Sequence, residues 1–251
     1  MKLGIGVLLF IFLVGCNKDE QNPLLSEEEH HQDVIRMVAN FEQNPQIIIY
    51  YEPTEDSVQN EMASIHGIQS TDYVHKDNKY QYLSYQISEL IKRLNSYPIA
   101  FMEKANLNYI YIVSSRTLHY SGMTITGYGT IALNNRRPET LDHELFHTFD
   151  PQINSIKWTN AVWDFDSAWR SLNPPNFNYG DGCGQDDRAS TYTEGFITQY
   201  CRCLAVEDRA VTFQMIISEN EVLLEKIKQD PYLNAKVEFM KNLLNDYGYN
   251  L

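Results

Sequence analysis

The segment TLDHELFHTFD, residues 140–150, has an apolar residue at every fourth position: Leu141, Leu145 and Phe149. A repeat of this kind predicts a helix whose apolar stripe faces a core. Pro138 suits the first turn of such a helix, where its missing N–H costs nothing, and Pro151 is expected to mark the far end. The segment therefore predicts a helix between these two prolines.

Two histidines on this helix are placed to bind one metal ion. His143 and His147 are four residues apart, so their imidazoles project from the same side of successive turns. Each can bind zinc at about 2.0–2.1 Å through a ring nitrogen. Glu144 is offset from that side and lies beside the expected metal-bound water, where it can act as a base. The alternative is a pair of surface histidines on a polar helix face.

Two histidines leave the coordination of zinc incomplete, so a third ligand is expected elsewhere in the chain. The metzincin arrangement needs a glycine three residues after His147 and a histidine six residues after it. Asp150 and Ile153 occupy those positions, which excludes that arrangement. Asp150 lies about 10 Å along the helix from His143. It is therefore expected to support the site from behind the ligands or to cap the helix.

Glu207 is the acid best placed to supply the third ligand. It opens the segment EDRAVTFQMII, and Ala210 and Val211 follow three and four positions later, so its side chain shares a helix face with apolar neighbours. A carboxylate on such a face needs a partner, and a metal ion is one. The alternative is a capping glutamate that faces solvent. The other nearby acids fit mostly solvated loops: Asp164, Asp166, Asp181, Asp186, Asp187, Glu194 and Asp208.

The pattern HExxH followed by E-D-x-A-x-x-F resembles the gluzincin class of zinc peptidases. Within that class it is similar to the zinc-binding metallopeptidases found as bacterial surface lipoproteins. A more distant similarity is to the catalytic domain of anthrax lethal factor and to the Pro-Pro endopeptidases. The resemblance spans about residues 138–213 and implies a zincin-like α+β fold, with a small twisted sheet, an active-site helix and a mainly helical C-terminal half.

The resemblance also implies roles for individual residues. One Zn²⁺ ion per chain would be bound by His143, His147 and Glu207, with Glu144 as the base in peptide hydrolysis. Tyr200 matches a tyrosine near the metal that donates a hydrogen bond to the developing oxyanion. The chain departs from several relatives at Val211, where they carry a second glutamate, and Asp208 or Asp150 is the candidate replacement.

Two other functions fit the same sequence. A surface lipoprotein that captures a glycan or peptide without cutting it could use the aromatic residues Trp158, Trp163, Trp169, Tyr179 and Tyr192. An inactive, zinc-stabilised domain is the other possibility, which the departure at Val211 keeps open. The intact Glu144 favours catalysis over capture. A peptide substrate is expected to pair with the segment MTITGYGTIALNN, residues 123–135, unless that segment is only a core strand.

The first residues, MKLGIGVLLFIFLVGC, are typical of an exported bacterial lipoprotein. Their apolar run is too short to span a bilayer, and LVGC resembles a lipobox that ends at Cys16. We expect a signal peptide over residues 1–15, a tether over 16–30 and a metallopeptidase domain over 31–251. Lys18, Asp19 and Glu20 resemble a surface-export signal, so a lipid anchor at the outer membrane or cell surface is expected. An ordinary signal peptide is the alternative.

The amino-acid composition limits the classes of molecule that the chain is expected to bind. A formal net charge of −13 argues against a nucleic-acid partner, because phosphates would be repelled. A peptide or protein substrate, membrane attachment through lipid and a monomeric chain are expected. For Cys183, Cys201 and Cys203 an oxidising compartment predicts one disulfide, from Cys183 to either of the others, and one free thiol. Three buried free thiols remain an alternative.

The remaining patterns predict an α+β layout. Strands are expected within residues 45–53, 108–115 and 123–135, where Gly127 and Gly129 indicate a bulge or a close backbone approach in the last one. Residues 80–98 predict a helix, and residues 151–199 predict irregular structure with one short helix at 164–172. Helical patterns return over residues 207–228. A final amphipathic helix carries Leu233, Val237, Met240, Leu244 and Tyr247.

Overall fold

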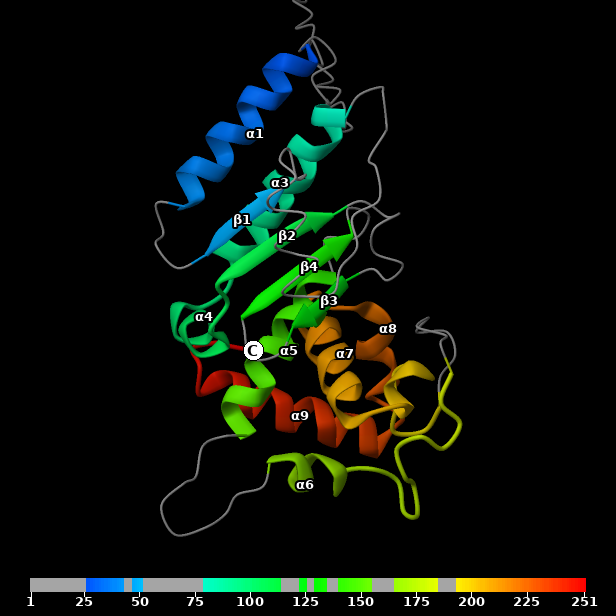
Figure 1. Cartoon of the computed structure of the whole chain (residues 1–251). Helices are drawn as coiled ribbons and strands as arrows, with labels where there is room; N and C mark the ends of the chain where they lie inside the picture. Colours follow the sequence, from blue (N-terminus) through cyan, green and yellow to red (C-terminus); the bar gives the residue numbers. More distant parts are fainter. Residues whose placement is uncertain are drawn as a thin grey trace, which may run out of the picture.

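The computed structural model describes residues 26–42, 47–51, 79–113, 122–125, 129–134, 140–154, 165–184 and 193–251. Its elements (Figure 1) are, in chain order, α1(Glu27–Glu42), β1(Ile48–Tyr51), α3(Lys79–Asn95), α4(Ile99–Ala105), β2(Tyr109–Val113), β3(Gly122–Ile125), β4(Thr130–Asn134), α5(Thr140–Asn154), α6(Phe165–Arg170), the 3-10 turn η1(Tyr200–Arg202), α7(Ala205–Ile217), α8(Glu221–Lys226) and α9(Pro231–Asn245). A small sheet joined to a mainly helical C-terminal half confirms the predicted α+β class.

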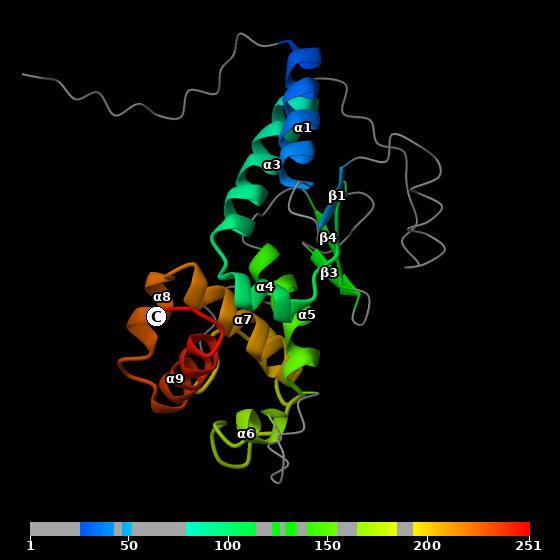
Figure 2. The ribbon, with the colours of Figure 1, turned by 90° about the vertical axis from the view of Figure 1, so that its left-hand side faces the viewer.

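The sheet has the strand order β1-β2-β4-β3. β1, β2 and β4 are parallel, and β3 pairs antiparallel with β4 as a terminal strand of the described sheet. Alternate residues on one face are buried in the core: Ile49, Ile110, Ile112, Ile131 and Leu133. Helices α3, α4 and α5 lie on one side of the sheet (Figure 2), which explains the apolar character of that face.

Residues 123–135 form two strands instead of one interrupted strand, so that prediction was wrong. β3 and β4 pair antiparallel, and Gly129 precedes β4 with a φ of 61°. A Cβ atom at Gly129 would lie 2.1 Å from the carbonyl oxygen of Asn106, so the predicted close backbone approach at this glycine is confirmed. Gly127 lies outside the described residues. A reversal of the chain therefore occurs where the sequence pattern indicated only a bulge.

Most of the other predicted elements are present. Residues 48–51 and 109–113 are strands, α3 buries Leu83, Ile87, Leu90 and Leu94, and α6 is the expected short helix. The helical pattern over residues 207–228 is divided into α7 and α8. Glu219 has a φ of 48°, and the side chain of Asn220 caps a new helix by accepting from the backbone N–H groups of Val222 and Leu223.

The start of α1 shortens the predicted tether. Glu27 begins the helix, so residues 27–30 are helical. Ser26 and Glu29 form a reciprocal cap, in which the Ser26 N–H donates to Glu29 Oε2 at 2.7 Å and the Glu29 N–H donates to Ser26 Oγ at 3.3 Å. The signal segment, Cys16 and Pro138 lie outside the described residues. Across the described ranges, no helix combines the length and apolarity needed to cross a membrane.

Candidate metal centre

Helix α5 carries the two histidines, and its length differs from the prediction. Leu141, Leu145 and Phe149 are fully buried, as the four-residue repeat predicted. Pro151 lies inside the helix, which continues to Asn154, so the proline does not mark its end. A proline at this position removes one helical hydrogen bond. Ile153 is buried in the core two residues later, which stabilises the extra residues.

Helix α7 brings Glu207 against α5 so that three donor atoms converge. Nε2 of His143 is 3.1 Å from Nε2 of His147 and 3.1 Å from Oε2 of Glu207. Nε2 of His147 is 3.3 Å from the same oxygen. Ligand atoms of a tetrahedral zinc site are about 3.3 Å apart when each bond is about 2.0–2.1 Å long. The group of His143, His147 and Glu207 could therefore hold a metal ion, and the described residues contain no second group of this kind.

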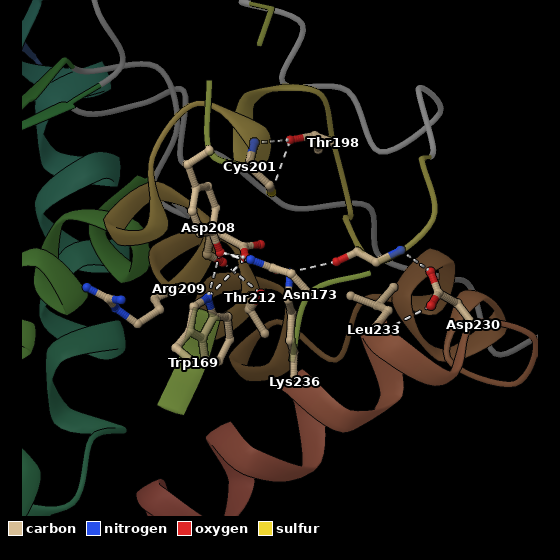
Figure 3. Close-up of polar contacts among 12 residues, drawn as sticks. Trp169, Asn173, Thr198, Cys201, Asp208, Arg209, Thr212, Asp230, Leu233 and Lys236 are labelled. Carbon is tan, nitrogen blue, oxygen red and sulfur yellow. Dashed lines mark hydrogen bonds and ion pairs between the residues drawn. The ribbon is translucent and has the colours of Figure 1, made fainter. Parts of the chain in front are cut away.

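The orientation of α7 follows from the two residues after Glu207. Asp208 is fully buried, and its Oδ2 accepts hydrogen bonds from Lys236 of α9 at 2.7 Å and from Trp169 of α6 at 3.0 Å (Figure 3). Asp208 is thus an exception to the expectation that most of the nearby acids are solvated. Because Asp208 points into the helical half, Glu207 one position earlier is turned toward α5.

Arg209 connects α7 to α5 a second time. Its guanidinium donates to Asp150 Oδ2 at 2.7 Å and 3.1 Å and to Asp166 Oδ1 at 2.8 Å. Asp150 therefore pairs with Arg209 one turn beyond His147, and Asp166 is a structural acid of α6 and not a freely solvated one. Asp181 accepts from the Asn178 N–H at 3.2 Å in an exposed turn, and Glu194 is exposed. Asp164, Asp186 and Asp187 lie outside the described residues.

The charges of the site influence one another strongly. Burial alone would raise the pKa of Glu207, but hydrogen bonds from His143 and His147 hold it well below its ordinary value. Burial alone would lower the pKa of His147, yet the hydrogen bond and negative charge of Glu207 raise it on balance. Glu207 is thus an anion that attracts positive charge to the imidazoles, and a metal cation would satisfy the same three atoms.

Glu144 lies beside this group and is almost completely buried. Burial raises the pKa of its carboxyl, and the positive potential of the two histidines opposes that rise. The hydroxyl of Thr124 on β3 is 2.8 Å from Glu144 Oε2. Glu144 is absent from the three-residue group that could hold a metal, which leaves its carboxylate available for proton transfer.

Tyr200, in η1, lies near the site. Its ring centroid is 6.3 Å from that of His143. Burial and the negative charge of Glu207 raise the pKa of its phenol, so the hydroxyl stays protonated and able to donate. Val211 is buried on α7.

A disulfide anchors the turn that carries Tyr200. Cys183 is bonded to Cys203, and Cys201 is a buried free thiol whose pKa burial raises to about 12. The prediction of one disulfide and one free thiol is therefore confirmed, and the alternative of three free thiols is wrong. The N–H of Gly180 also donates to the carbonyl of Arg202 at 2.8 Å, so two links tie the preceding loop to η1.

Asp142 is a buried acid that sequence reasoning missed. It is fully buried and accepts a hydrogen bond from Arg93 Nε at 2.8 Å, together with hydrogen bonds from Arg93 Nη2 and the hydroxyl of Tyr97. This pair fastens the first turn of α5 to α3, directly before His143. Its position between the apolar Leu141 and His143 of the motif was the one sign in the sequence that Asp142 is buried.

The aromatic residues considered for ligand capture are partly inside the protein. Trp169 is fully buried, and its indole N–H donates to Asp208. Tyr179 is partly buried and donates to the same carboxylate at 2.7 Å. These two side chains therefore stabilise the helical half. Trp158, Trp163 and Tyr192 lie outside the described residues.

Comparison with protein-family models, with curated proteins and with solved structures gave no match. The fold and the site define an α+β protein whose two histidines and one glutamate could hold a metal ion.

Proposed function

We propose that this chain is a zinc-dependent peptidase with a zincin-like fold, of the gluzincin class that its motifs resemble. The observation that carries the proposal is the convergence of His143, His147 and Glu207 at distances suited to tetrahedral zinc, with the buried Glu144 beside them. Three protein ligands leave one position for water, which is the arrangement of a catalytic and not a structural zinc site.

Bound zinc would lower the pKa of a water molecule and polarise the scissile carbonyl. The carboxylate of Glu144 accepts the proton of the attacking water, and its raised pKa suits a group that must later return that proton. The proton passes to the nitrogen of the leaving amine as the peptide bond breaks. The hydroxyl of Tyr200 donates a hydrogen bond to the carbonyl oxygen as it becomes negative.

An extended peptide is the substrate class that we infer. β3 is a terminal strand of the described sheet, and it contacts α5 through the hydrogen bond from Thr124 to Glu144. Backbone groups on the outer side of a terminal strand can pair with a peptide by strand addition. Together with the lipoprotein-like first residues, this supports a lipid-anchored peptidase at the outer membrane or cell surface that acts on peptides or proteins.

The proposal is tested by metal analysis and peptide cleavage on the same purified protein. About one zinc ion per chain is expected. Glu207→Ala should lose most of the zinc, whereas Glu194→Ala, an exposed acid outside the site, should keep it. Glu144→Gln should keep the zinc and lose cleavage of a peptide library, because only the base is removed.

Three results would contradict this assignment. Wild-type cleavage by Glu144→Gln would exclude the hydrolytic role of that residue. Loss of zinc from Glu194→Ala but not from Glu207→Ala would place the metal elsewhere. Full zinc content without cleavage of any peptide would favour the inactive, zinc-stabilised domain that Val211 keeps open.

A further inference from the structure

The terminal strand β3 contacts Glu144 directly through Thr124. The hydroxyl of Thr124 is 2.8 Å from Glu144 Oε2 and also 2.8 Å from the backbone carbonyl oxygen of Glu144. Glu144 is almost completely buried, so a polar partner of its carboxylate replaces water that the site excludes. The contact therefore influences where the carboxylate lies.

Gly122, two residues before Thr124 on the same strand, limits the space around Glu144. A Cβ atom at Gly122 would lie 2.6 Å from Glu144 Cγ, 2.7 Å from Glu144 Oε1 and 2.6 Å from Cγ2 of Thr140. Contacts this short require the neighbours to move. Glu144 can thus occupy its position only because residue 122 has no side chain.

We propose that Thr124 and Gly122 are positioning residues for Glu144, so that β3 places the general base as well as the substrate. The inference rests on the proposed function and deepens it. An extended peptide that pairs with β3 would have its backbone aligned to the strand that also holds Glu144. The distance between the base and the scissile bond would then depend on one element instead of on two that move independently.

The geometry of the Thr124 hydroxyl suits both forms of the base. A hydroxyl has one proton to donate and can accept as well. When Glu144 is ionised, Thr124 donates to Oε2. When Glu144 carries the proton taken from water, its carboxyl O–H donates to Oγ1, and the Thr124 proton turns to the Glu144 carbonyl oxygen. Glu144 keeps a hydrogen bond to Thr124 in either state without moving.

The first test uses metal-free protein and does not depend on activity. Thr124→Val should lower the melting temperature by about 2–4 °C, the shift expected for one hydrogen bond in a chain of this size. The shift should be smaller in a Glu144→Ala background, because only the hydrogen bond from Thr124 to the backbone carbonyl oxygen of residue 144 remains to be lost there. Equal shifts in the two backgrounds would overturn the proposal. Thr148→Val is the matched control, since its hydroxyl donates at 2.8 Å to the Leu145 carbonyl of the same helix and should show equal shifts in both backgrounds.

The second test uses the zinc-loaded protein and a cleavable peptide. Thr124→Val should reduce kcat by about 10- to 100-fold with unchanged zinc content and KM, since misplacement of the base affects the chemical step. Thr124→Ser should restore most of kcat, because it keeps the hydroxyl. Gly122→Ala should also retain zinc and lose turnover. Wild-type kcat in Thr124→Val would overturn the proposal.

A crystal structure of the Thr124→Val variant separates this inference from the proposed function. Displacement of the Glu144 carboxylate supports the positioning role even if the wild-type chain cleaves no peptide. An unmoved carboxylate overturns the role even if the chain is an active peptidase. The melting temperatures of the metal-free variants give the same separation.

Discussion

Three consecutive residues of α7 point to three different partners, and together they determine how the site forms. Glu207 contacts His143 and His147, Asp208 contacts Lys236 of α9, and Arg209 contacts Asp150 of α5. Successive side chains on a helix are about 100° apart. Only one rotation of α7 about its axis therefore allows all three contacts to form together. Glu207 is thus oriented by the two residues that follow it.

The proposed role of Tyr200 depends on a single hydroxyl group and can be tested by removing it. As a donor to the oxyanion it would act in the transition state more than in the ground state. Tyr200→Phe should therefore keep zinc and substrate affinity and reduce kcat by about 10²–10³-fold. Single-turnover kinetics on a cleavable peptide measures the chemical step. Tyr85→Phe, an exposed tyrosine of α3, should leave that step unchanged.

A chemical step of unchanged rate in Tyr200→Phe would remove the residue from the mechanism. The phenol would then only pack beside His143, since phenylalanine keeps the ring and loses only the hydroxyl.

At the scale of elements, the buried pair of Asp208 and Lys236 joins α7 to α9. Both side chains are fully buried, and Nζ of Lys236 also donates to the carbonyl of Gly195 at 2.8 Å. Lys236→Met should lower the free energy of unfolding by about 3–5 kcal/mol, because it leaves a buried carboxylate without its cation. Denaturant unfolding measures this loss.

Lys228→Met provides the control for this prediction. Lys228 pairs with Glu225 at 2.6 Å, but both side chains are exposed, so its loss should cost less than about 1 kcal/mol. Similar losses in the two variants would show that the buried pair does not hold α7 against α9. A loss confined to Lys236→Met should be accompanied by weaker zinc binding, because Glu207 precedes Asp208.

At the scale of the whole molecule, the candidate site draws on α5, α7, β3 and η1. An ion pair and core packing hold α5 against α7: Arg209 pairs with Asp150, and the aromatic rings of Phe146 and Phe213 pack with centroids 5.1 Å apart. The three donor atoms that could hold a metal ion are therefore brought together by the fold. This differs from small zinc domains, in which the metal itself drives folding.

Removal of the metal should consequently leave the fold intact. We expect a chelator to lower the melting temperature and added zinc to restore it, because a ligand that binds only the folded state stabilises it by mass action. The far-UV circular dichroism spectrum at 25 °C should not change. In Glu207→Ala the melting temperature should be insensitive to zinc. Loss of helical signal on chelation would contradict a preformed site.

The spacing of apolar residues in the sequence was enough to predict those helices and strands that depend on neighbouring residues alone. The four-residue repeat of Leu141, Leu145 and Phe149 predicted α5 and the shared side of its histidines, because a helix places residues i and i+4 together. Local signals were misjudged where two competed: Pro151 indicated an end that the burial of Ile153 overrides, and Asn220 starts a new helix within an apolar pattern. The break at Gly129 was visible, but the hairpin it belongs to was not.

Only the tertiary structure decided which distant residues meet. Glu207 is 64 residues from His143, Lys236 is 28 from Asp208, and Thr124 is 20 from Glu144. The exposed or buried state of Asp208 likewise depends on α6 and α9 and not on its neighbours in sequence. Periodicity specifies the face on which a side chain lies, but its partner depends on how the elements pack, since burying a charge costs free energy that only a specific contact offsets. The spacing of the histidines was therefore a property of the sequence, and the convergence of three donor atoms is a property of the fold.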